Sequence, residues 1–316
     1  LYHQPQKPTG AYSLLKRRTL VGAGVAGLAL GTLPAAWRTA TATADTAPPA
    51  TGLALPKVGL GTWITFNVGN DPRLRARSVE VMRTFFAEGG GMIDSSPMYG
   101  SSQDIVGHGL SELGYPETLF SAEKVWTSSP GDGREQTDQS LRKWGLDRFD
   151  LMQVHNLVAA EAHLERLLDR KAAGEIGHVG ITTSHGRRHG DMERLMREYP
   201  LDFVQLTYNA LDREAEARLL PFARERGIGV IVNRPFRRGA LIARTARVPL
   251  PGFASEIGAD SWAQLLLKFI LSHPAVTVAI PATTQPAHMR ENKASARGPM
   301  PDEAMRQEIA RRVAAL

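Results

Sequence analysis

The chain of 316 residues contains no cysteine. This absence excludes disulfide bonds, thiolate catalysis, cysteine-based zinc sites and a lipid-modified N-terminal cysteine. A chain without thiols also has nothing to mispair in an oxidising compartment, so the composition is compatible with export.

Acidic residues are missing from residues 1–44, although this segment carries five lysines and arginines. The remainder has 33 basic and 32 acidic residues, so most of the formal charge of +6 belongs to the N-terminal segment. The high pI therefore gives no argument for nucleic acid as a partner. The length allows one or two domains, because single α/β barrels reach ~250 residues.

A long hydrophobic run is also missing from the N-terminal segment. A basic cluster at 16–18 precedes a glycine- and alanine-rich stretch from Leu20 to about Leu33, and Ala42 and Ala44 follow in Ala-x-Ala spacing. This is the layout of a cleavable export signal, and paired arginines before a weakly apolar core resemble a twin-arginine signal.

These features divide the chain into three segments. Residues 1–44 are predicted to be an export signal and cleavage region, residues 45–54 a linker, and residues 55–316 the folded domain. The twin-arginine export machinery is the expected partner of residues 14–44, and the mature chain is expected to be periplasmic or secreted. The alternatives are a cytoplasmic chain or one tethered by an uncleaved signal. We expect no permanent membrane anchor, because the apolar run falls short of the ~20 residues that span a bilayer.

The same segment contains a misleading glycine pattern. Gly22, Gly24 and Gly27 satisfy G-x-G-x-x-G, which is typical of dinucleotide-binding folds. That motif needs a buried strand before it and a helix and second strand after it. Here arginines precede it and a Thr/Ala/Pro-rich linker follows, so we reject a Rossmann site.

From residue 53 onward, short apolar runs alternate with amphipathic helical stretches. The strand candidates are "KVGLGTW", "GMIDSS", "LFSAEKV", "FDLMQVHN", "HVGITT", "FVQLTYN", "GVIVNRPF" and "VTVAIPAT". The helical stretches include "RSVEVMRTFFAEGG", "REQTDQSLRKWG", "EAHLERLLDRKAAGEIG" and "REAEARLLPFARERG", in which Pro221 either kinks the helix or lies in its first turn. Eight such alternations predict a single-domain (β/α)8 TIM barrel of the α/β class.

Polar residues that end strands are the ones to inspect, because the sites of such barrels lie where the strands end. Asp94 and Tyr99 follow the second predicted strand, Lys124 ends the third and His155 ends the fourth. A lone aspartate at a strand end is usually a helix cap. Four chemically compatible residues facing one mouth favour a catalytic site instead.

The chemistry of these four residues is that of acid catalysis. A tyrosine titrates near pH 10, and a lysine cation within ~4–6 Å is expected to lower that pKa by roughly 1–3 units. Asp94 would hold Lys124, Lys124 would tune Tyr99 as a general acid, and a neutral His155 would orient a substrate oxygen. This arrangement suits the reduction of a carbonyl group.

Several motifs, in this order, resemble the aldo-keto reductases across residues 55 to about 300. They are "GLGTW", "IDSSPMYG", "AEK", "QVHN", "VQLTYN", "NRPFRRGAL" and "AIPATTQPAHMRENKA". The resemblance implies a tetrad of Asp94, Tyr99, Lys124 and His155 with a bound nicotinamide cofactor. It also implies hydride transfer between that cofactor and an aldehyde or ketone, with Tyr99 protonating the oxygen.

A barrel without a Rossmann unit must hold the dinucleotide on its loops, and those after the last two strands supply the usual phosphate site. "NRPFRRGAL" offers backbone amides and the cations Arg237 and Arg238, and Thr283, Thr284 and Gln285 precede Pro286, a good first helical residue. With family positions added, the predicted cofactor-binding residues are Thr62, Trp63, Thr182, Thr183, Gln205, Asn209, Asn233, Pro235, Phe236, Arg237, Gly239, Leu241, Ala282, Thr283, Thr284, His288, Glu291 and Asn292.

The chain departs from the family pattern at three of these positions. Ala282 and His288 stand where NADP-selective members commonly have a lysine and an arginine, so Arg290, His288 or the 237–238 pair would have to compensate. We expect NADP(H) to be the preferred cofactor, and NAD(H) is the alternative. Asn233 replaces a common aromatic residue, and Phe236 could take over its stacking on the nicotinamide.

Two further patterns carry less weight. His185 and His189 have a metal-binding spacing, but two arginines intervene and no third ligand is evident, so we predict no metal site. The tail "MPDEAMRQEIARRVAAL" is predicted to be an amphipathic helix packed on the barrel. The segments around 126–133 and 244–260 are expected to shape the substrate pocket.

Export and cofactor use together imply a cofactor loaded before export and retained afterwards. Such a cofactor would have to be recycled in place by a second substrate. Two competing functions remain open: a catalytically silent nicotinamide-binding sensor or subunit of a larger assembly, and a Schiff-base lyase with Lys124 as nucleophile.

Overall fold

The computed structural model describes residues 52–316. The predicted export signal, its glycine pattern and linker residues 45–51 lie outside the described residues. Among residues 52–316, no helix has the length and apolar character needed to cross a bilayer. In the same range, no group of three or more His, Asp or Glu side chains is placed to hold a metal ion.

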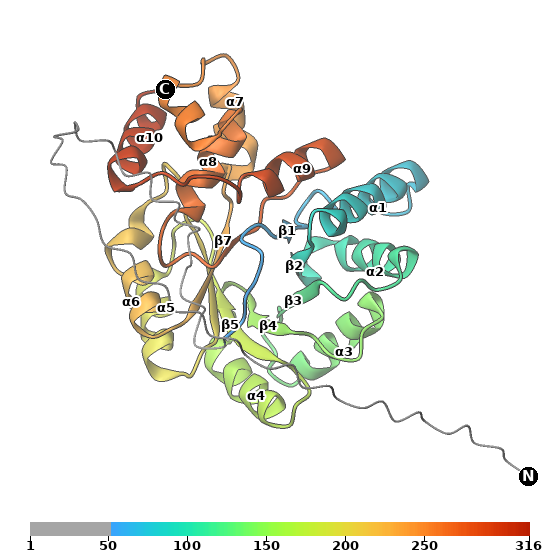
Figure 1. Cartoon of the computed structure of the whole chain (residues 1–316). Helices are drawn as coiled ribbons and strands as arrows, with labels where there is room; N and C mark the ends of the chain where they lie inside the picture. Colours follow the sequence, from blue (N-terminus) through green and yellow to red (C-terminus); the bar gives the residue numbers. More distant parts are fainter. Residues whose placement is uncertain (1–51) are drawn as a thin grey trace, which may run out of the picture. The chain divides into compact units, whose positions relative to one another are not determined.

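Eight parallel strands follow one another in chain order around the sheet (Figure 1). They are β1 Leu60–Gly61, β2 Gly91–Asp94, β3 Leu119–Val125, β4 Leu151–Val154, β5 His178–Thr182, β6 Phe203–Thr207, β7 Gly229–Asn233 and β8 Val278–Ala279. A parallel bridge between Val58 and Ala279 joins the last strand to the first. The sheet is therefore a closed (β/α)8 barrel, as predicted.

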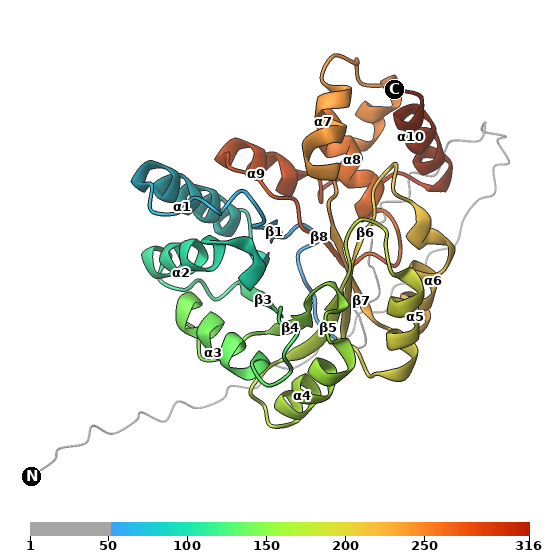
Figure 2. The same ribbon diagram turned by 180° about the vertical axis from the view of Figure 1, so that it is seen from behind.

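Helices surround the strands, as the two opposite views show (Figures 1 and 2). They are α1 Pro72–Ala87, α2 Ser102–Leu113, α3 Gly133–Trp144, α4 Ala160–Ala172, α5 His189–Glu198, α6 Leu219–Glu225, α7 Ala240–Thr245, α8 Trp262–Leu271, α9 Pro286–Ala294 and α10 Glu303–Ala315. Pro221 lies in the first turn of α6, where its missing N–H costs no intrahelical bond.

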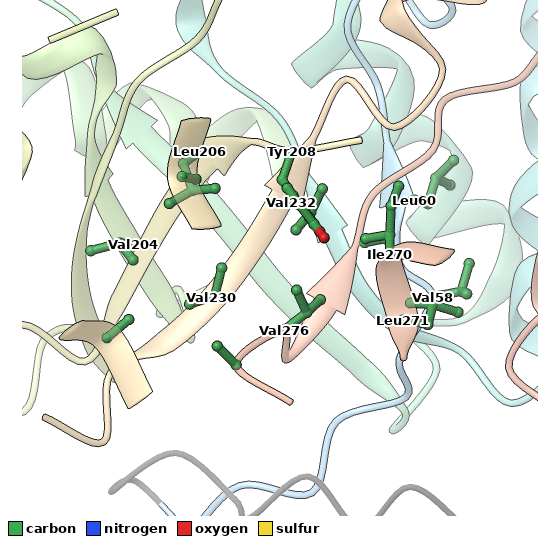
Figure 3. Close-up of a cluster of buried hydrophobic side chains, with 14 of the residues drawn as sticks. Val58, Leu60, Val204, Leu206, Tyr208, Val230, Val232, Ile270, Leu271 and Val276 are labelled. Atoms are coloured by element: carbon green, nitrogen blue, oxygen red, sulfur yellow. The ribbon is translucent and has the colours of Figure 1, made fainter. Parts of the chain in front are cut away.

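Alternation along the strands separates two apolar layers. Val204 and Leu206 of β6 and Val230 and Val232 of β7 belong to the large cluster between strands and helices. Figure 3 shows part of this outer layer, together with Ile270 and Leu271 of α8.

The intervening residues, such as Phe203 and Ile231, form a second cluster with Met92 and Phe120. Leu53 and Leu55 pack against this second cluster. The apolar residues of the inner layer occupy the first part of the strands. The inward-facing positions nearer the carboxyl ends are occupied by polar side chains.

The tail forms α10, which packs on α8 as predicted. Ile309 and Val313 are fully buried there. Arg306 is 4% exposed and donates to the Tyr208 hydroxyl at 2.6 Å and to Glu216 at 2.9 Å. These contacts anchor the C-terminal helix by both apolar and charged interactions.

Candidate active site

The segment after β2 presents the first two candidate residues. Asp94 is the last residue of β2, and a 3-10 turn at Pro97–Tyr99 follows it. The Ser96 hydroxyl caps this turn by accepting the Met98 N–H at 3.2 Å. Gly100 then reverses the chain at φ 62°, in the left-handed region that favours glycine. The sequence therefore places Tyr99 one short turn beyond the carboxylate.

Lys124 and Asp94 form a buried ion pair inside the barrel. Lys124 Nζ lies 2.6 Å from Asp94 Oδ2 and 2.5 Å from the Ser95 carbonyl oxygen. The Lys124 side chain is inaccessible to solvent, and that of Asp94 is 2% exposed. Although burial alone would lower the pKa of Lys124, the negative charge of Asp94 raises it. The lysine therefore stays an ammonium.

Two glutamine amides hold the other carboxylate oxygen. Gln205 Nε2 donates to Asp94 Oδ1 at 2.7 Å, and Gln153 Nε2 donates to it at 3.3 Å. Gln205 was predicted only as a cofactor-binding residue, and Gln153 was not predicted. Alternation along β4 could have identified it, because Gln153 is two residues before His155 and so faces the same side of the strand.

Tyr99 and His155 meet above this ion pair. Lys124 Nζ lies 5.0 Å from the centre of the Tyr99 ring. The Tyr99 and His155 rings have centroids 5.6 Å apart and are nearly perpendicular, at 86°. His155 Nδ1 lies 2.7 Å from the Ser96 hydroxyl oxygen. The four predicted catalytic residues thus come together at the carboxyl ends of β2, β3 and β4.

The electrostatics agree with the prediction for His155 but not for Tyr99. Burial, with a contribution from Lys124, lowers the pKa of His155 to about 2, so the imidazole is neutral. Burial raises the pKa of Tyr99 to about 12, because desolvation of the phenolate outweighs the opposing attraction of Lys124. The expected fall in the Tyr99 pKa is therefore wrong: the lysine only limits the rise.

Glu123 lies beside the ion pair but outside the barrel interior. Its carboxylate accepts hydrogen bonds from Gln103 and Trp144, both at 2.9 Å, and from the Lys124 backbone N–H at 2.8 Å. Burial raises its pKa to about 7, despite the opposing effect of Lys124. These bonds tie β3 to α2 and α3, so Glu123 fixes the strand that carries Lys124.

The loop after β4 is held in an unusual conformation. Asn156, Leu157 and Ala159 all have positive φ, between 45° and 54°. Arg188 Nη1 donates to the carbonyl oxygens of Asn156 and Leu157 at 3.0 and 3.2 Å. Such backbone strain persists only where surrounding contacts over-determine it. The loop next to His155 is therefore fixed by a side chain from the loop after β5.

A cavity of about 780 Å³ opens at this end of the barrel. Asp94, Tyr99 and His155 line it, while Lys124 lies beneath its wall. The volume is at the upper end of the ~300–1,000 Å³ of small-molecule sites. The predicted cofactor contacts that line the cavity are Thr62, Trp63, Thr182, Thr183, Gln205, Asn233, Pro235, Phe236, Gly239, Ala282, Thr283, His288, Glu291 and Asn292.

Four predicted cofactor contacts are not part of the cavity wall. Asn209 organises its own loop by bonding Asp212 and the Arg234 carbonyl. Arg237 forms an ion pair with Asp212 at 3.0 Å. Leu241 is buried in the outer apolar layer, and the Thr284 carbonyl accepts a hydrogen bond from Arg77. Each of these residues makes structural contacts, through its side chain or, for Thr284, its backbone, that the sequence did not reveal.

Two arginines of the loop after β7 line the cavity instead. Arg238 stacks on Trp63 with its guanidinium 4.2 Å from the ring centre, so the loops after β7 and β1 meet. Arg234 also lines the cavity, and within residues 52–316 neither cation has an ion pair with a carboxylate. Burial and the neighbouring Arg238 lower the pKa of Arg234. The charge of Asp212 offsets this effect only in part. Two crowded cations that have no direct ion pair with a carboxylate favour an anion at this position.

The cavity suits an anionic molecule that carries several polar groups. Its wall includes Tyr99 and His155 together with Thr283, His288 and Asn292, and the two arginines are among its lining. The Thr65 hydroxyl oxygen is buried in the cavity wall without a hydrogen-bond partner. A dinucleotide fits these features, since its phosphates would neutralise the arginines.

Of the two segments predicted to shape the substrate pocket, only one contributes to the cavity wall. Thr245 and Ala246 line the cavity, but residues 126–133 do not contribute to its wall. The loop after β1 does contribute, through Trp63, Ile64 and Thr65. Ile64 has φ 65°, which is rare for a β-branched residue, and is 61% exposed. No local sequence pattern predicts this backbone strain.

A parallel barrel with an acid–base cluster at the carboxyl ends of its strands and a cavity of about 780 Å³ beside that cluster has the arrangement of a barrel enzyme. The family model described as "Aldo/keto reductase family" matches residues 57–309 of the chain. Since this match covers well over half of the sequence, the protein belongs to the aldo/keto reductase family and is an aldo-keto reductase.

Individual relatives are moderately similar. Aldo-keto reductase YhdN of Bacillus subtilis (strain 168) is 29% identical over 212 residues, which cover 61% of this chain and 62% of YhdN. The chain thus spans less than two thirds of YhdN. Methylglyoxal reductase YeaE of Escherichia coli (strain K12) is 29% identical over 257 residues, covering 77% of this chain and 86% of YeaE. An NADH-specific methylglyoxal reductase of the same organism is 27% identical over 239 residues, or 65% of this chain and 71% of that protein.

Solved structures share the fold. An aldo-keto reductase from Bacillus halodurans in its holo form superposes with a TM-score of 0.69 at 20% identity, covering 84% of this chain and 94% of that one. An aldo/keto reductase from Klebsiella pneumoniae in complex with NADP and acetate gives 0.67 at 21% identity, covering 82% and 92%. At this identity the likeness establishes the fold alone.

Replacing Lys124 by methionine tests the buried ion pair. The change leaves the Asp94 carboxylate buried without its cation, so we expect the free energy of unfolding at neutral pH to fall by about 3–5 kcal/mol. Urea unfolding measures this loss. Adding Asp94→Asn to Lys124→Met should restore much of the stability. A double variant no more stable than Lys124→Met would contradict the ion-pair account.

Proposed function

We propose that the protein is an NAD(P)H-dependent carbonyl reductase and alcohol dehydrogenase that acts on aldehydes or ketones. The observation that carries this proposal is the placement of the Tyr99 phenol between the Lys124 ammonium and the neutral His155 ring, at the wall of a dinucleotide-sized cavity. The names of two relatives make methylglyoxal a suitable first substrate to test.

The cofactor, when bound, supplies the hydride, and the protein supplies the proton and the positioning. Arg234, Arg238, Thr283 and Asn292 would hold it along the cavity. Because His155 is neutral, it can donate a hydrogen bond to the carbonyl oxygen without protonating that oxygen. Tyr99 donates the proton to the oxygen as it becomes an alkoxide, which is far more basic than a phenolate with a pKa of about 12. Lys124 stabilises the phenolate that remains.

The geometry opposes the two competing functions. A Schiff-base lyase needs a neutral lysine amine that substrate can reach. Lys124 is fully buried, and Asp94 keeps it protonated. A silent nicotinamide sensor would not need an aligned phenol, ammonium and imidazole, so the complete tetrad supports an enzyme.

The Tyr99→Phe variant tests the proposed acid. It removes one hydroxyl and leaves the ring packing, so we expect reduction of methylglyoxal to fall by at least about 100-fold, as for the loss of a general acid. Stopped assays of NADPH consumption measure the rate, and fluorescence titration should give an unchanged Kd for NADPH. An unaltered kcat would exclude Tyr99 from this role.

The raised pKa of Tyr99 predicts opposite pH dependence for the two directions. Reduction needs the phenol, which stays protonated below a pKa of about 12. Oxidation of an alcohol needs the phenolate, whose fraction rises about tenfold for each pH unit below that pKa. We therefore expect kcat/KM for oxidation to climb between about pH 8 and 10, while Tyr99 causes no loss of reduction there. A plateau in oxidation below about pH 9 contradicts this assignment.

NADP(H) is the proposed preferred cofactor. Support comes from His288 and from Arg234 and Arg238, all of which line the cavity. Arg77 of α1 also donates to the Thr284 carbonyl oxygen at 3.0 Å, bringing a cation to the loop before α9. Arg290 Nε lies 3.7 Å from Glu88 Oε1, so Arg290 is a weaker candidate for binding the extra phosphate of NADP(H).

Titration with both reduced cofactors checks this preference. We expect a lower Kd for NADPH than for NADH, because the extra phosphate meets a cationic loop. Arg77→Gln should narrow the difference while leaving the Kd for NADH unchanged, and Arg83→Gln, on the outer part of the same helix, should alter neither. Tighter binding of NADH by the unaltered protein would reverse the proposal.

We extend the proposal to export. The sequence of residues 1–44 supports a twin-arginine signal, an export route that carries folded proteins, and therefore a periplasmic or secreted enzyme. Arg238 stacks on Trp63 and so joins the loops after β7 and β1. This contact supports slow release of a cofactor loaded before export. A retained cofactor would be recycled by alternating carbonyl and alcohol substrates.

Expression of the full chain in a bacterium with a functional twin-arginine system tests this extension. We expect the processed chain in the periplasmic fraction, with nicotinamide absorbance in the purified protein. Replacing both Arg17 and Arg18 by lysine should keep the protein in the cytoplasm. Periplasmic protein wholly free of nicotinamide would defeat cofactor retention, and unchanged localisation of the lysine variant would defeat the export route.

A further inference from the structure

Ser96 stands between two catalytic residues in the sequence but has no role in the proposed proton transfer itself. It is fully buried, two residues after Asp94 and three before Tyr99. Its hydroxyl oxygen lies 2.7 Å from His155 Nδ1. It also accepts the Met98 N–H at 3.2 Å. This hydroxyl therefore links the turn that carries Tyr99 to the ring of His155.

The direction of the hydrogen bond between Ser96 and His155 follows from the partners present. A buried hydroxyl hydrogen needs an acceptor, because leaving it unpaired costs ~1–3 kcal/mol. In the described part of the chain, His155 Nδ1 is the acceptor within hydrogen-bond distance of Ser96 Oγ. If Nδ1 carried the hydrogen, the Ser96 O–H would have no partner. Nδ1 must then be the bare nitrogen of a neutral imidazole.

A bare Nδ1 places the ring hydrogen on Nε2. This nitrogen has no protein partner within residues 52–316, and His155 lines the cavity beside Tyr99. In the opposite tautomer, Nε2 would be an acceptor and would repel a carbonyl oxygen. The choice of tautomer therefore decides whether His155 can bind the substrate.

We propose that Ser96 is a positioning residue that fixes His155 as the Nε2–H tautomer, so that the imidazole donates a hydrogen bond to the substrate oxygen. The catalytic part of this inference rests on the proposed carbonyl reduction, whereas the tautomer itself does not. Ser96 does not touch the reacting atoms. It acts by holding the ring and by occupying the nitrogen that faces away from the substrate.

Three variants separate this role from simple packing. Ser96→Ala removes the hydroxyl, and Ser96→Thr keeps it on the same carbon. Ser102→Ala is the matched control, because Ser102 is also fully buried and its hydroxyl bonds Ser95, not His155. We expect kcat/KM for methylglyoxal to fall about 10–100-fold in Ser96→Ala, as for other partners that orient a catalytic histidine. Ser96→Thr should recover most of the activity, and Ser102→Ala should lose less than threefold or so.

The nitrogen NMR spectrum of protein with ¹⁵N-labelled histidine reads the tautomer directly. His155→Gln identifies the His155 signals by their disappearance. In the unaltered protein we expect the protonated nitrogen of His155 to be Nε2, and in Ser96→Ala we expect a mixture of both tautomers. This readout needs neither substrate nor turnover.

The outcomes are distinct. A hydrogen on Nδ1 in the unaltered protein overturns the proposal even if Ser96→Ala fails to fold. An unaltered kcat/KM in Ser96→Ala, or an equal loss in Ser102→Ala, also overturns it. An inactive wild-type protein with the Nε2–H tautomer would refute the proposed reductase function while leaving the assignment of Ser96 to the tautomer intact.

Discussion

The buried pair of Lys124 and Asp94 is the interaction on which the site depends. Removing two charges from water costs several kcal/mol for each ion, so such a pair persists only when the remaining polar atoms are also satisfied. Here the Ser95 carbonyl binds the ammonium, and the amides of Gln153 and Gln205 bind the carboxylate. The upper interior of the barrel is therefore a connected polar layer that holds one positive charge beneath Tyr99.

This polar layer rests on an apolar one. Met92, Phe120, Leu151 and Phe203 fill the barrel below the ion pair, and every second residue along each strand faces inward. The same alternation that aims Phe120 and Ala122 inward aims Lys124 inward two residues later. A slip of one residue in β3 would exchange Lys124 for Glu123, which instead accepts from Trp144 outside the barrel. The packing of the apolar layer thus sets the register of Lys124 and the other residues that we propose as catalytic.

Burial shifts the pKa values of the site residues in different directions. It lowers the pKa of His155 to about 2 and raises that of Tyr99 to about 12, so both are neutral near pH 7. Lys124 is kept positive by Asp94. A neutral donor, a neutral acid and a fixed cation are the groups needed where negative charge develops on an oxygen. Arg234 and Arg238, which have no ion pair with a carboxylate within residues 52–316, extend the same preference for anions beyond the reacting centre.

The sequence by itself predicted the fold class, the order of the strands and the four clustered residues that we propose as catalytic, because these depend on local periodicity and on polar residues at strand ends. The segment "LFSAEKV" became β3 with the same limits. Only the tertiary structure decided which cofactor candidates face the cavity. Arg237 pairs with Asp212 whereas Arg238 stacks on Trp63, and nothing local distinguishes two adjacent arginines. The direction of the Tyr99 pKa shift could also be judged only from the tertiary structure. Desolvation depends on what encloses the ring, whereas the sequence shows only which charges are near. Pairings such as Ser96 with His155, which join residues far apart in the chain, exist only once the barrel has closed.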